Sequence, residues 1–373
     1  MEDAGALLGK ARRIVVKVGS SLLTAADGTL KRDFIAGFGR ELAKWRGEKR
    51  DFAIVTSGAV AAGMSVLGRQ SKPQTITDMH VMAAVGQISL FRAYDEILSP
   101  LGFMPAQVLL TAEELAHRTT YINARSTLRR LFELGVVPIV NENDAIAITD
   151  RRFGDNDRLA AEIANLIEAE LLVILTDVPG VYRDLEAKEL LAHAVAADEL
   201  LDRCVDDSRP TRHGSGGMGS KIEAARRAAN SGAATVIAAG ADFGRLVAGE
   251  GAGTLITDGA GPVRSRMRAK ERWLATCAKA NGSVYIDEGA VAALLERGRS
   301  LLPAGVTRVE GSFQRGDVVS CLDGGGTPVA QGMINYASHE VAALARRQSS
   351  EIEKVLGYVI AEEIIHRDNM VRL

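Results

Sequence analysis

The sequence predicts an α/β protein with a mostly parallel sheet, followed by a small β-barrel-like domain. Over the first two thirds of the 373 residues, short apolar runs without polar alternation alternate with segments of helical pattern. Such runs are typical of strands buried on both faces, and their alternation with helices favours a parallel sheet that helices cover. Ligands of these sheets bind beyond the carboxyl ends of the strands, so the site is expected in the loops that follow them.

Each expected element rests on one of these patterns. Apolar runs predict strands over Ile14–Val18, Phe52–Thr56, Val136–Val140, Leu171–Leu175 and Thr235–Ala238. Helical patterns predict helices over Arg32–Arg46, Thr119–Leu134, Arg158–Glu168 and Lys221–Ser231. After about residue 255 short strands separated by turns dominate, and they are expected over Ser283–Asp287, Thr307–Glu310, Asp317–Leu322 and Val329–Ile334.

A change in composition near residue 260 predicts a domain boundary. Two Gly-rich segments, Gly249–Gly253 and Gly259–Pro262, lead into a basic stretch between Arg264 and Arg272. We therefore expect a first domain over residues 1–260, a basic linker over residues 261–274 and a second domain over residues 275–373.

Composition and charge argue against several classes of protein. Hydrophobic residues make up 47% and charged residues 25% of the chain, as in globular proteins with a large core. The 45 basic and 47 acidic residues give a formal net charge of -2, which disfavours a protein that mainly coats nucleic acid or an acidic membrane. The three cysteines fit neither a zinc motif nor a disulfide framework. No secretory signal and no apolar run of about 18 residues is found, so a cytoplasmic location is expected.

Three segments suit the binding of an anion such as phosphate. Lys17 follows a predicted strand, and Gly19–Ser21 supplies a glycine and two hydroxyl groups beside its ammonium. Val55–Gly63 ends a strand and opens a helix of small residues, whose N-terminus carries free N–H groups. Gly214–Lys221 is a Gly-rich turn with a lysine, although it satisfies neither the dinucleotide fingerprint nor the P-loop motif. A solvated turn, tight helix–strand packing and a surface loop are the respective alternatives.

Carboxylates and carboxamides crowd two further loops. Pro138–Asp144 and Phe153–Leu159 together carry seven such side chains. Clusters of this kind bind a substrate ammonium, a metal or basic side chains. Turn and cap chemistry is the alternative, since Asp157 is also placed to cap a helix beginning near Arg158. A third strand end, Leu175–Tyr182, begins with polar residues that suit a nucleotide and ends in a turn.

Taken in order, these segments resemble the amino acid kinase superfamily and, within it, the glutamate 5-kinase family. The matching stretches run from residue 14 to residue 231, and the combination of NENDAIA, GDND and GSGGMGSK is specific. The C-terminal stretch beginning VYIDEGAVAALLERGRSLLPAGV resembles the PUA domain of many bacterial members. The resemblance implies an open αβα sandwich as the catalytic domain, followed by a PUA-like domain. It also implies ATP-dependent phosphorylation of the γ-carboxylate of L-glutamate, the first step of proline biosynthesis, with Mg²⁺ carried on the nucleotide.

The resemblance further implies the roles of individual residues. Lys17 and Lys221 would contact the transferring phosphates, Asp157 would organise both lysines, and no residue is implied as a metal ligand. A carboxylate is ionised at neutral pH and needs no general base, so the lysines and Mg²⁺ mainly offset repulsion between two anions. The residues implied to hold glutamate are Ser57, Asp144 and Asn156. Those implied to bind ATP are Lys17, Gly19, Thr176, Asp177, Ser215, Gly216, Gly217, Met218, Gly219, Ser220 and Lys221.

Two other interpretations stay open at this point. One is a kinase of the same superfamily that acts on another small acidic substrate. The other is an RNA-binding protein in which the PUA-like domain is the active part, although acidic residues outnumber basic ones from Leu274 onward. The resemblance also implies feedback inhibition by proline, self-association as a dimer or tetramer, and no membrane partner.

Overall fold

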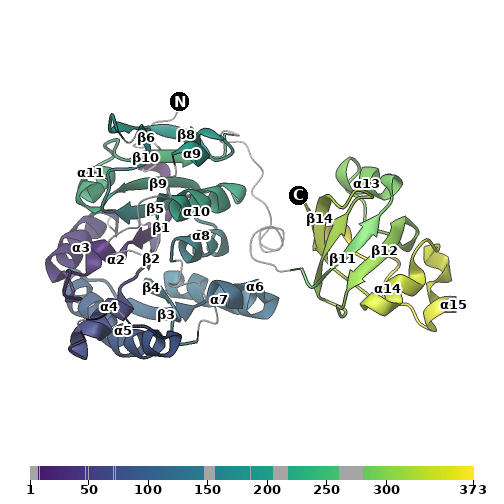
Figure 1. The fold of residues 1–373 in the computed structure, drawn as a ribbon, viewed down its shortest axis with the longest axis horizontal. Helices are drawn as coiled ribbons and strands as arrows, with labels where there is room; N and C mark the ends of the chain where they lie inside the picture. The colour runs from purple at the N-terminus through teal and green to yellow at the C-terminus, as the bar shows by residue number, and fades with distance from the viewer. Residues whose placement is uncertain are drawn as a thin grey trace. The chain divides into compact units, whose positions relative to one another are not determined.

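The computed structural model describes residue 7 and residues 9–46, 48, 50–69, 71, 73–146, 156–184, 186–204, 217–259 and 280–373. These residues form two compact units, one N-terminal and one C-terminal, each with its own hydrophobic core (Figure 1). Within these ranges no helix combines the length and the apolar character that crossing a bilayer requires. The predicted linker, residues 261–274, lies entirely outside the described residues, and the domain boundaries stay a prediction.

A parallel sheet forms the centre of the N-terminal unit. Its strands, as far as the structure describes them, follow the order β3-β4-β2-β1-β5-β9-β10-β8, and only β9 and β10 pair in antiparallel fashion. Burial on both faces explains why the central strands β1 and β5 are built mainly from Val, Ile and Leu, with Lys17 as the polar exception near the end of β1. The strands are β1 (Arg13–Val18), β2 (Asp51–Val55), β3 (Pro105–Leu110), β4 (Val137–Glu142), β5 (Leu171–Thr176), β8 (His193–Val195), β9 (Ala234–Ala239) and β10 (Thr254–Thr257). A separate ribbon pairs β6 (Tyr182–Asp184) with β7 (Glu189–Leu190).

Helices cover both faces of this sheet, which makes the unit an open αβα sandwich (Figure 1). On one face α3, α5 and α11 enclose a core that includes Ile14, Val16 and Val18 of β1. On the other face α8 and α10 lie side by side. Successive side chains of a strand point to opposite faces, so Lys17 lies on the face that α8 and α10 cover. The helices are α2 (Ser20–Leu23), α3 (Arg32–Arg46), α4 (Ala59–Val66), α5 (Ile76–Leu98), α6 (Ala112–Ala116), α7 (Arg118–Glu133), α8 (Asn156–Leu166), α9 (Leu200–Arg203), α10 (Met218–Asn230) and α11 (Phe243–Val247).

The C-terminal unit is built on a second, smaller sheet. Its strands follow the order β12-β11-β13-β14-β15, with β11 and β13 parallel and the other pairs antiparallel. Tyr336 and Phe313 are among its largest buried side chains. The strands are β11 (Gly282–Ile286), β12 (Val306–Gly311), β13 (Val318–Leu322), β14 (Pro328–Met333) and β15 (Met370–Arg372), and the helices are α13 (Glu288–Leu295), α14 (Ser338–Leu344) and α15 (Ile352–Leu356).

The predicted fold class is confirmed, and the differences concern the edges of the sheets. All nine predicted strands are present, with shifts of one or two residues at their ends. Strands β3, β6, β7, β8, β10 and β15 were not predicted. Each lies at or next to a sheet edge or is at most three residues long, where the burial signal is weak. The longest helix, α5, was also missed.

Candidate active site

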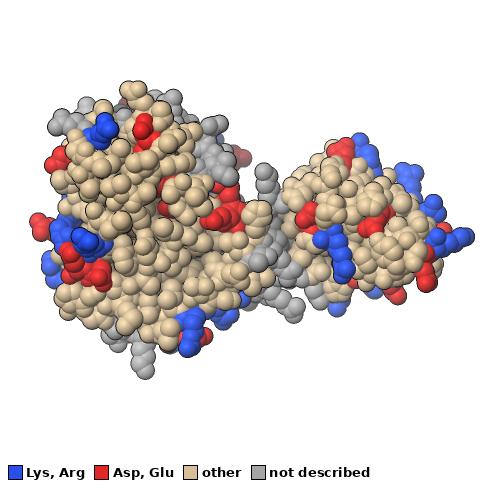
Figure 2. Space-filling model, turned by 90° about the horizontal axis from the view of Figure 1, so that it is seen from below, with Lys and Arg blue, Asp and Glu red and all other residues tan. Residues whose placement is uncertain are grey.

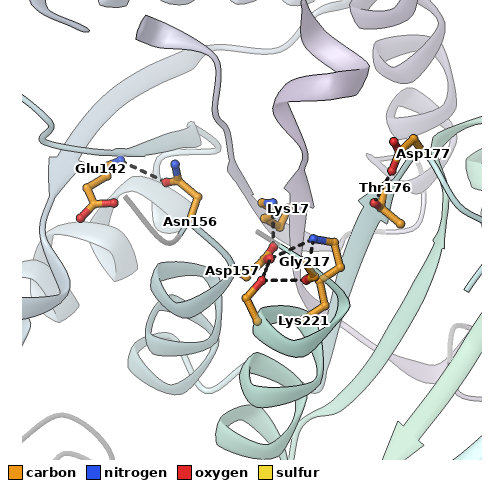
Figure 3. Close-up of polar contacts among 9 residues, drawn as sticks. Lys17, Glu142, Asn156, Asp157, Thr176, Asp177, Gly217 and Lys221 are labelled. Atoms are coloured by element: carbon orange, nitrogen blue, oxygen red, sulfur yellow. Dashed lines mark hydrogen bonds and ion pairs between the residues drawn. The ribbon is translucent and has the colours of Figure 1, made fainter. Parts of the chain in front are cut away.

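Two lysines from distant parts of the chain meet on one buried carboxylate (Figure 3). Lys17 belongs to β1, and its Nζ lies 2.6 Å from Oδ1 of Asp157. Lys221 lies in the first turn of α10, and its Nζ lies 3.1 Å from Oδ2 of Asp157. The hydroxyl of Ser220 donates a hydrogen bond of 2.8 Å to the same oxygen. The Asp157 side chain is only 1% exposed, so the structure brings both predicted lysines together around one inaccessible anion.

The electrostatics of this cluster favour the charged form of Asp157. Burial by itself raises the pKa of the Asp157 carboxyl group, but the ammonium groups of Lys17 and Lys221 and the hydroxyl of Ser220 lower that pKa well below its ordinary value. Two ammonium groups and one carboxylate leave an excess of positive charge among these three side chains. Fixed positive charge in a site that excludes water stabilises an incoming polyanion strongly.

A polar seam between α8 and α10 holds the two helices that carry Asp157 and Lys221. In the middle of the seam, Nη1 of Arg227 lies 3.6 Å from Oε1 of the buried Glu162. At its far end the hydroxyl of Ser231 donates a hydrogen bond to Oδ1 of Asn165. Buried alanines of α10 let the helices approach closely. We define the seam by its residues Asp157, Glu162 and Asn165 of α8, Ser220, Lys221 and Arg227 of α10, and the C-cap residue of α10, Ser231.

The ends of β1 and β5 bring two of the predicted nucleotide contacts close to Lys17. The backbone N–H of Gly19 donates to the carbonyl of Leu175 at 3.1 Å, and a Cβ at Gly19 would lie 3.3 Å from that oxygen. A side chain at position 19 would therefore crowd the end of β5, which pairs with β1 in parallel. Thr176 ends β5, is buried, and donates its hydroxyl to Asp177 at 3.0 Å (Figure 3). These contacts hold the polar groups of Gly19, Thr176 and Asp177 in place at the ends of β1 and β5.

Of the remaining predicted nucleotide contacts, the described ones, Gly217 to Lys221, lie at the start of α10. Gly217 is the N-cap residue, and its carbonyl lies 3.5 Å from Nζ of Lys221. Helix N-termini carry unpaired N–H groups and partial positive charge, which suits phosphate. Met218, Gly219, Ser220 and Lys221 form the first turn of the helix. Ser215 and Gly216 lie outside the described residues, as do Gly154 and Asp155 of the GDND stretch.

The predicted glutamate contacts belong to three neighbouring segments. Ser57 precedes Gly58, whose φ of 95° lies in the left-handed region that favours glycine, and α4 begins directly after it. Asn156 opens α8, and its Oδ1 accepts a hydrogen bond of 3.3 Å from the backbone N–H of Glu142 (Figure 3). Asp144 lies in the turn after β4, where burial raises the pKa of its carboxyl group to about 6.

Helix α5 contributes two residues to this region that the sequence analysis missed. Gln87 accepts a hydrogen bond of 2.8 Å from Nδ2 of the buried Asn141, at the end of β4. His80 interacts electrostatically with Asp144 and lowers its pKa, against the larger effect of burial. No motif surrounds either residue, and only the distance of seven residues between them, which places both on one face of a helix, could have linked them.

Comparisons with known proteins show which family the chain belongs to. The amino acid kinase family model matches residues 12–239, and the PUA domain model matches residues 282–356. The chain belongs to the amino acid kinase family. A glutamate 5-kinase of Thioalkalivibrio sulfidiphilus is 46% identical over 98% of this chain and 98% of its own length. A glutamate 5-kinase of Nitrosococcus oceani is 47% identical over 97% of each chain. Family membership confirms the predicted resemblance along nearly the whole chain.

Proposed function

We propose that this amino acid kinase transfers the γ-phosphoryl group of ATP to the γ-carboxylate of L-glutamate. The product is L-glutamyl 5-phosphate, the first intermediate of proline biosynthesis. One observation carries the proposal: two buried ammonium groups converge on Asp157 at the carboxyl edge of the sheet, in a chain 46% identical to named glutamate 5-kinases. An anion that must react with a polyanion needs such a concentration of positive charge.

The reaction requires positioning and charge compensation more than acid–base chemistry. A γ-carboxylate oxygen attacks the γ-phosphorus of ATP, a carboxyl–phosphorus bond forms, and the bond from the γ-phosphorus to the bridging oxygen of ADP breaks. The carboxylate is already ionised at neutral pH, so no proton has to leave the nucleophile. In this proposal Lys17 and Lys221 lie along the transferring group and stabilise its oxygens. Asp157 holds both ammonium groups in place, which lowers the reorganisation that the reaction needs.

The substrates occupy opposite sides of the lysine pair in this proposal. ATP lies along the start of α10 and the end of β5, and Gly19, Thr176 and Asp177 line its site. Glutamate lies near the end of β4, where Ser57 and Asn156 hold its carboxylates and Asp144 binds its ammonium. The hydrogen bond between Asn156 and the backbone of Glu142 supports this arrangement, because it fixes the start of α8 against the end of β4.

Mg²⁺ belongs to the nucleotide in this proposal. The ion binds oxygen ligands and usually keeps several waters, with substrate phosphates as its main partners. Among the residues that the structure describes, no three His, Cys, Asp or Glu side chains gather into a metal cage. Because substrate phosphates are its usual partners, we assign the ion to the phosphate oxygens, where it would neutralise negative charge.

The test is ADP release in a coupled assay with purified protein, ATP, Mg²⁺ and a panel of acceptors. The panel contains L-glutamate, L-aspartate, N-acetyl-L-glutamate, carbamate, UMP and isopentenyl phosphate. Of these acceptors, we expect only L-glutamate to give ADP release. The reaction should also form an acyl phosphate that hydroxylamine traps as the hydroxamate. Release with another acceptor and none with glutamate would assign the chain to a different branch of the family.

The proposal also covers regulation, assembly and location. Proline inhibits at the glutamate site, and the chain associates into a dimer or tetramer in the cytoplasm. Exposed apolar residues on α5 support association, because Val81 is 48% and Ile88 66% exposed and they lie seven residues apart on one helix face. Proline titration in the ADP assay and light scattering of the eluted protein test the first two statements.

No observation favours RNA binding as the main function. On the visible face of the C-terminal unit, basic and acidic side chains lie interspersed (Figure 2). Arg308 stacks on Tyr285 and also pairs with Glu310 at 3.0 Å, so a neighbouring carboxylate compensates the charge of this arginine. A nucleic-acid footprint requires a continuous excess of basic residues.

A further inference from the structure

Helix α5 runs past the end of β4, where the proposed glutamate site lies. The hydrogen bond of 2.8 Å from Asn141 to Gln87 fixes this crossing at one point. His80 precedes Gln87 by seven residues, which is two helical turns, so both side chains project from the same face of α5. Asp144 follows Asn141 by three residues. The helix therefore presents His80 to the turn that carries Asp144.

Close packing leaves α5 little freedom to move away from this position. A Cβ on Gly86 would lie 1.8 Å from the carbonyl oxygen of Ala59, and a Cβ on Gly63 would lie 1.8 Å from that of Met82. The backbones of α4 and α5 are thus in direct contact. Because α4 begins directly after Ser57 and Gly58, the same packing fixes His80 relative to another predicted glutamate contact.

His80 is the charged group that acts on Asp144 within the part of the chain that the structure describes. Burial raises the pKa of the Asp144 carboxyl group to about 6, and the positive charge of His80 lowers it. Other groups near this turn are engaged elsewhere or uncharged. Asp157 pairs with the two lysines, Asn156 is neutral, and on α5 the carboxylate of Asp78 accepts the hydroxyl of Thr75 at the helix cap. Glu142, at the end of β4, brings a second carboxyl group to the region and no positive charge.

We propose that His80 is a positioning residue for the amino-acid substrate, which it assists by holding the Asp144 carboxylate charged and in place for the substrate ammonium. The inference rests on the role proposed above for Asp144. It adds a determinant that touches neither ATP nor the transferring phosphoryl group. It also predicts when the residue matters: near pH 6, where Asp144 is close to protonation, and not in alkaline solution, where Asp144 is fully ionised.

The test compares KM for L-glutamate at pH 6 and pH 8.5 in the full-length protein. His80→Gln is expected to raise this KM roughly twofold to fivefold at pH 6, the effect of one partly exposed ion pair, and to leave it unchanged at pH 8.5. His80→Lys, which carries a positive charge at both pH values, is expected to retain the low KM at pH 6. The KM for ATP should not change. The ratio of the two glutamate KM values within one protein does not depend on the fraction that folds.

Three comparisons keep the outcomes distinct. His339→Gln, at an exposed position of α14, is the matched control and should behave as wild type. In an Asp144→Asn background, His80→Gln should add nothing further. An equal rise in KM at both pH values, or a rise in the ATP KM, would overturn the inference. Wild-type turnover of glutamate with no effect of Asp144→Asn on KM would overturn the role of Asp144, while no turnover of glutamate at all would overturn the proposed function.

Discussion

Asp157 shows how one side chain can organise a charged site. Its carboxylate contacts two ammonium groups and one hydroxyl while almost no water reaches it. Removing one partner of a buried ion pair usually lowers the free energy of unfolding by several kcal/mol, because the remaining charge is buried without compensation. Here the loss of Asp157 would leave two ammonium groups to repel each other, so the position of its carboxylate matters as much as its charge.

Asp144 has the opposite environment, and that difference predicts a pH dependence. Burial raises its pKa to about 6, so the carboxylate that is proposed to bind the substrate ammonium becomes protonated as the pH falls through that value. We expect kcat/KM for glutamate to decline below about pH 6 in the wild type. In Asp144→Asn, kcat/KM should be lower at every pH, without this decline. Initial rates across pH 5 to 8.5 measure both effects, and an unchanged acidic decline in the variant would assign the titration to another group.

At the scale of elements, α4 and α5 contact each other backbone to backbone. This contact depends on Gly63 and Gly86, where any side chain would collide with the backbone of the facing helix. Sequence patterns predicted the start of α4 from its small residues, but they gave no sign of α5 as its partner. Long-range packing of this kind cannot be read from local periodicity.

The substitution Gly86→Ala tests this contact. The added Cβ would lie 1.8 Å from the carbonyl oxygen of Ala59, so the helices must separate, and we expect a loss of stability of about 2 kcal/mol or more. Gly37→Ala is the matched control within α3, where the nearest atom lies 3.8 Å away, and it should be neutral or stabilising by about 0.5–1 kcal/mol. Urea unfolding measures both, and a Gly86→Ala protein as stable as the control would contradict the packing described.

The sequence predicted those parts of the site that follow directly from buried strands. Lys17 and Thr176 lie at ends of unbroken apolar runs, and the rule that strands of a parallel sheet share one carboxyl edge brings them together. Asp157 and Lys221 lie at helix starts, and their pairing was implied only by the family resemblance. His80 and Gln87 were missed because they lie within a long helix and not at a strand end or a helix start. Nothing in the surrounding residues distinguishes them from ordinary partly buried polar groups.

At the scale of the whole molecule, the two units have separate cores and should unfold separately. The apolar clusters around β1 and around β11 share no residue among those described. We expect Val284→Ala, at a fully buried position of β11, to destabilise only the C-terminal unit, by roughly 2 kcal/mol. Calorimetry should show one transition shifted and the other unchanged, with glutamate-dependent ADP release preserved at 25 °C. A common shift of both transitions would show that the units unfold as one.

The central claim is that Lys17 and Lys221 act together on one transferring phosphoryl group. Single-turnover formation of glutamyl phosphate, measured for Lys17→Met, Lys221→Met and the double variant, tests it most directly. Each single variant is expected to lose at least about 10²-fold in rate, the scale of one lost electrostatic stabiliser. The double variant should lose far less than the product of the two single losses, because the residues work as a unit. A near-normal rate in either single variant, or losses that multiply in full, would contradict the account.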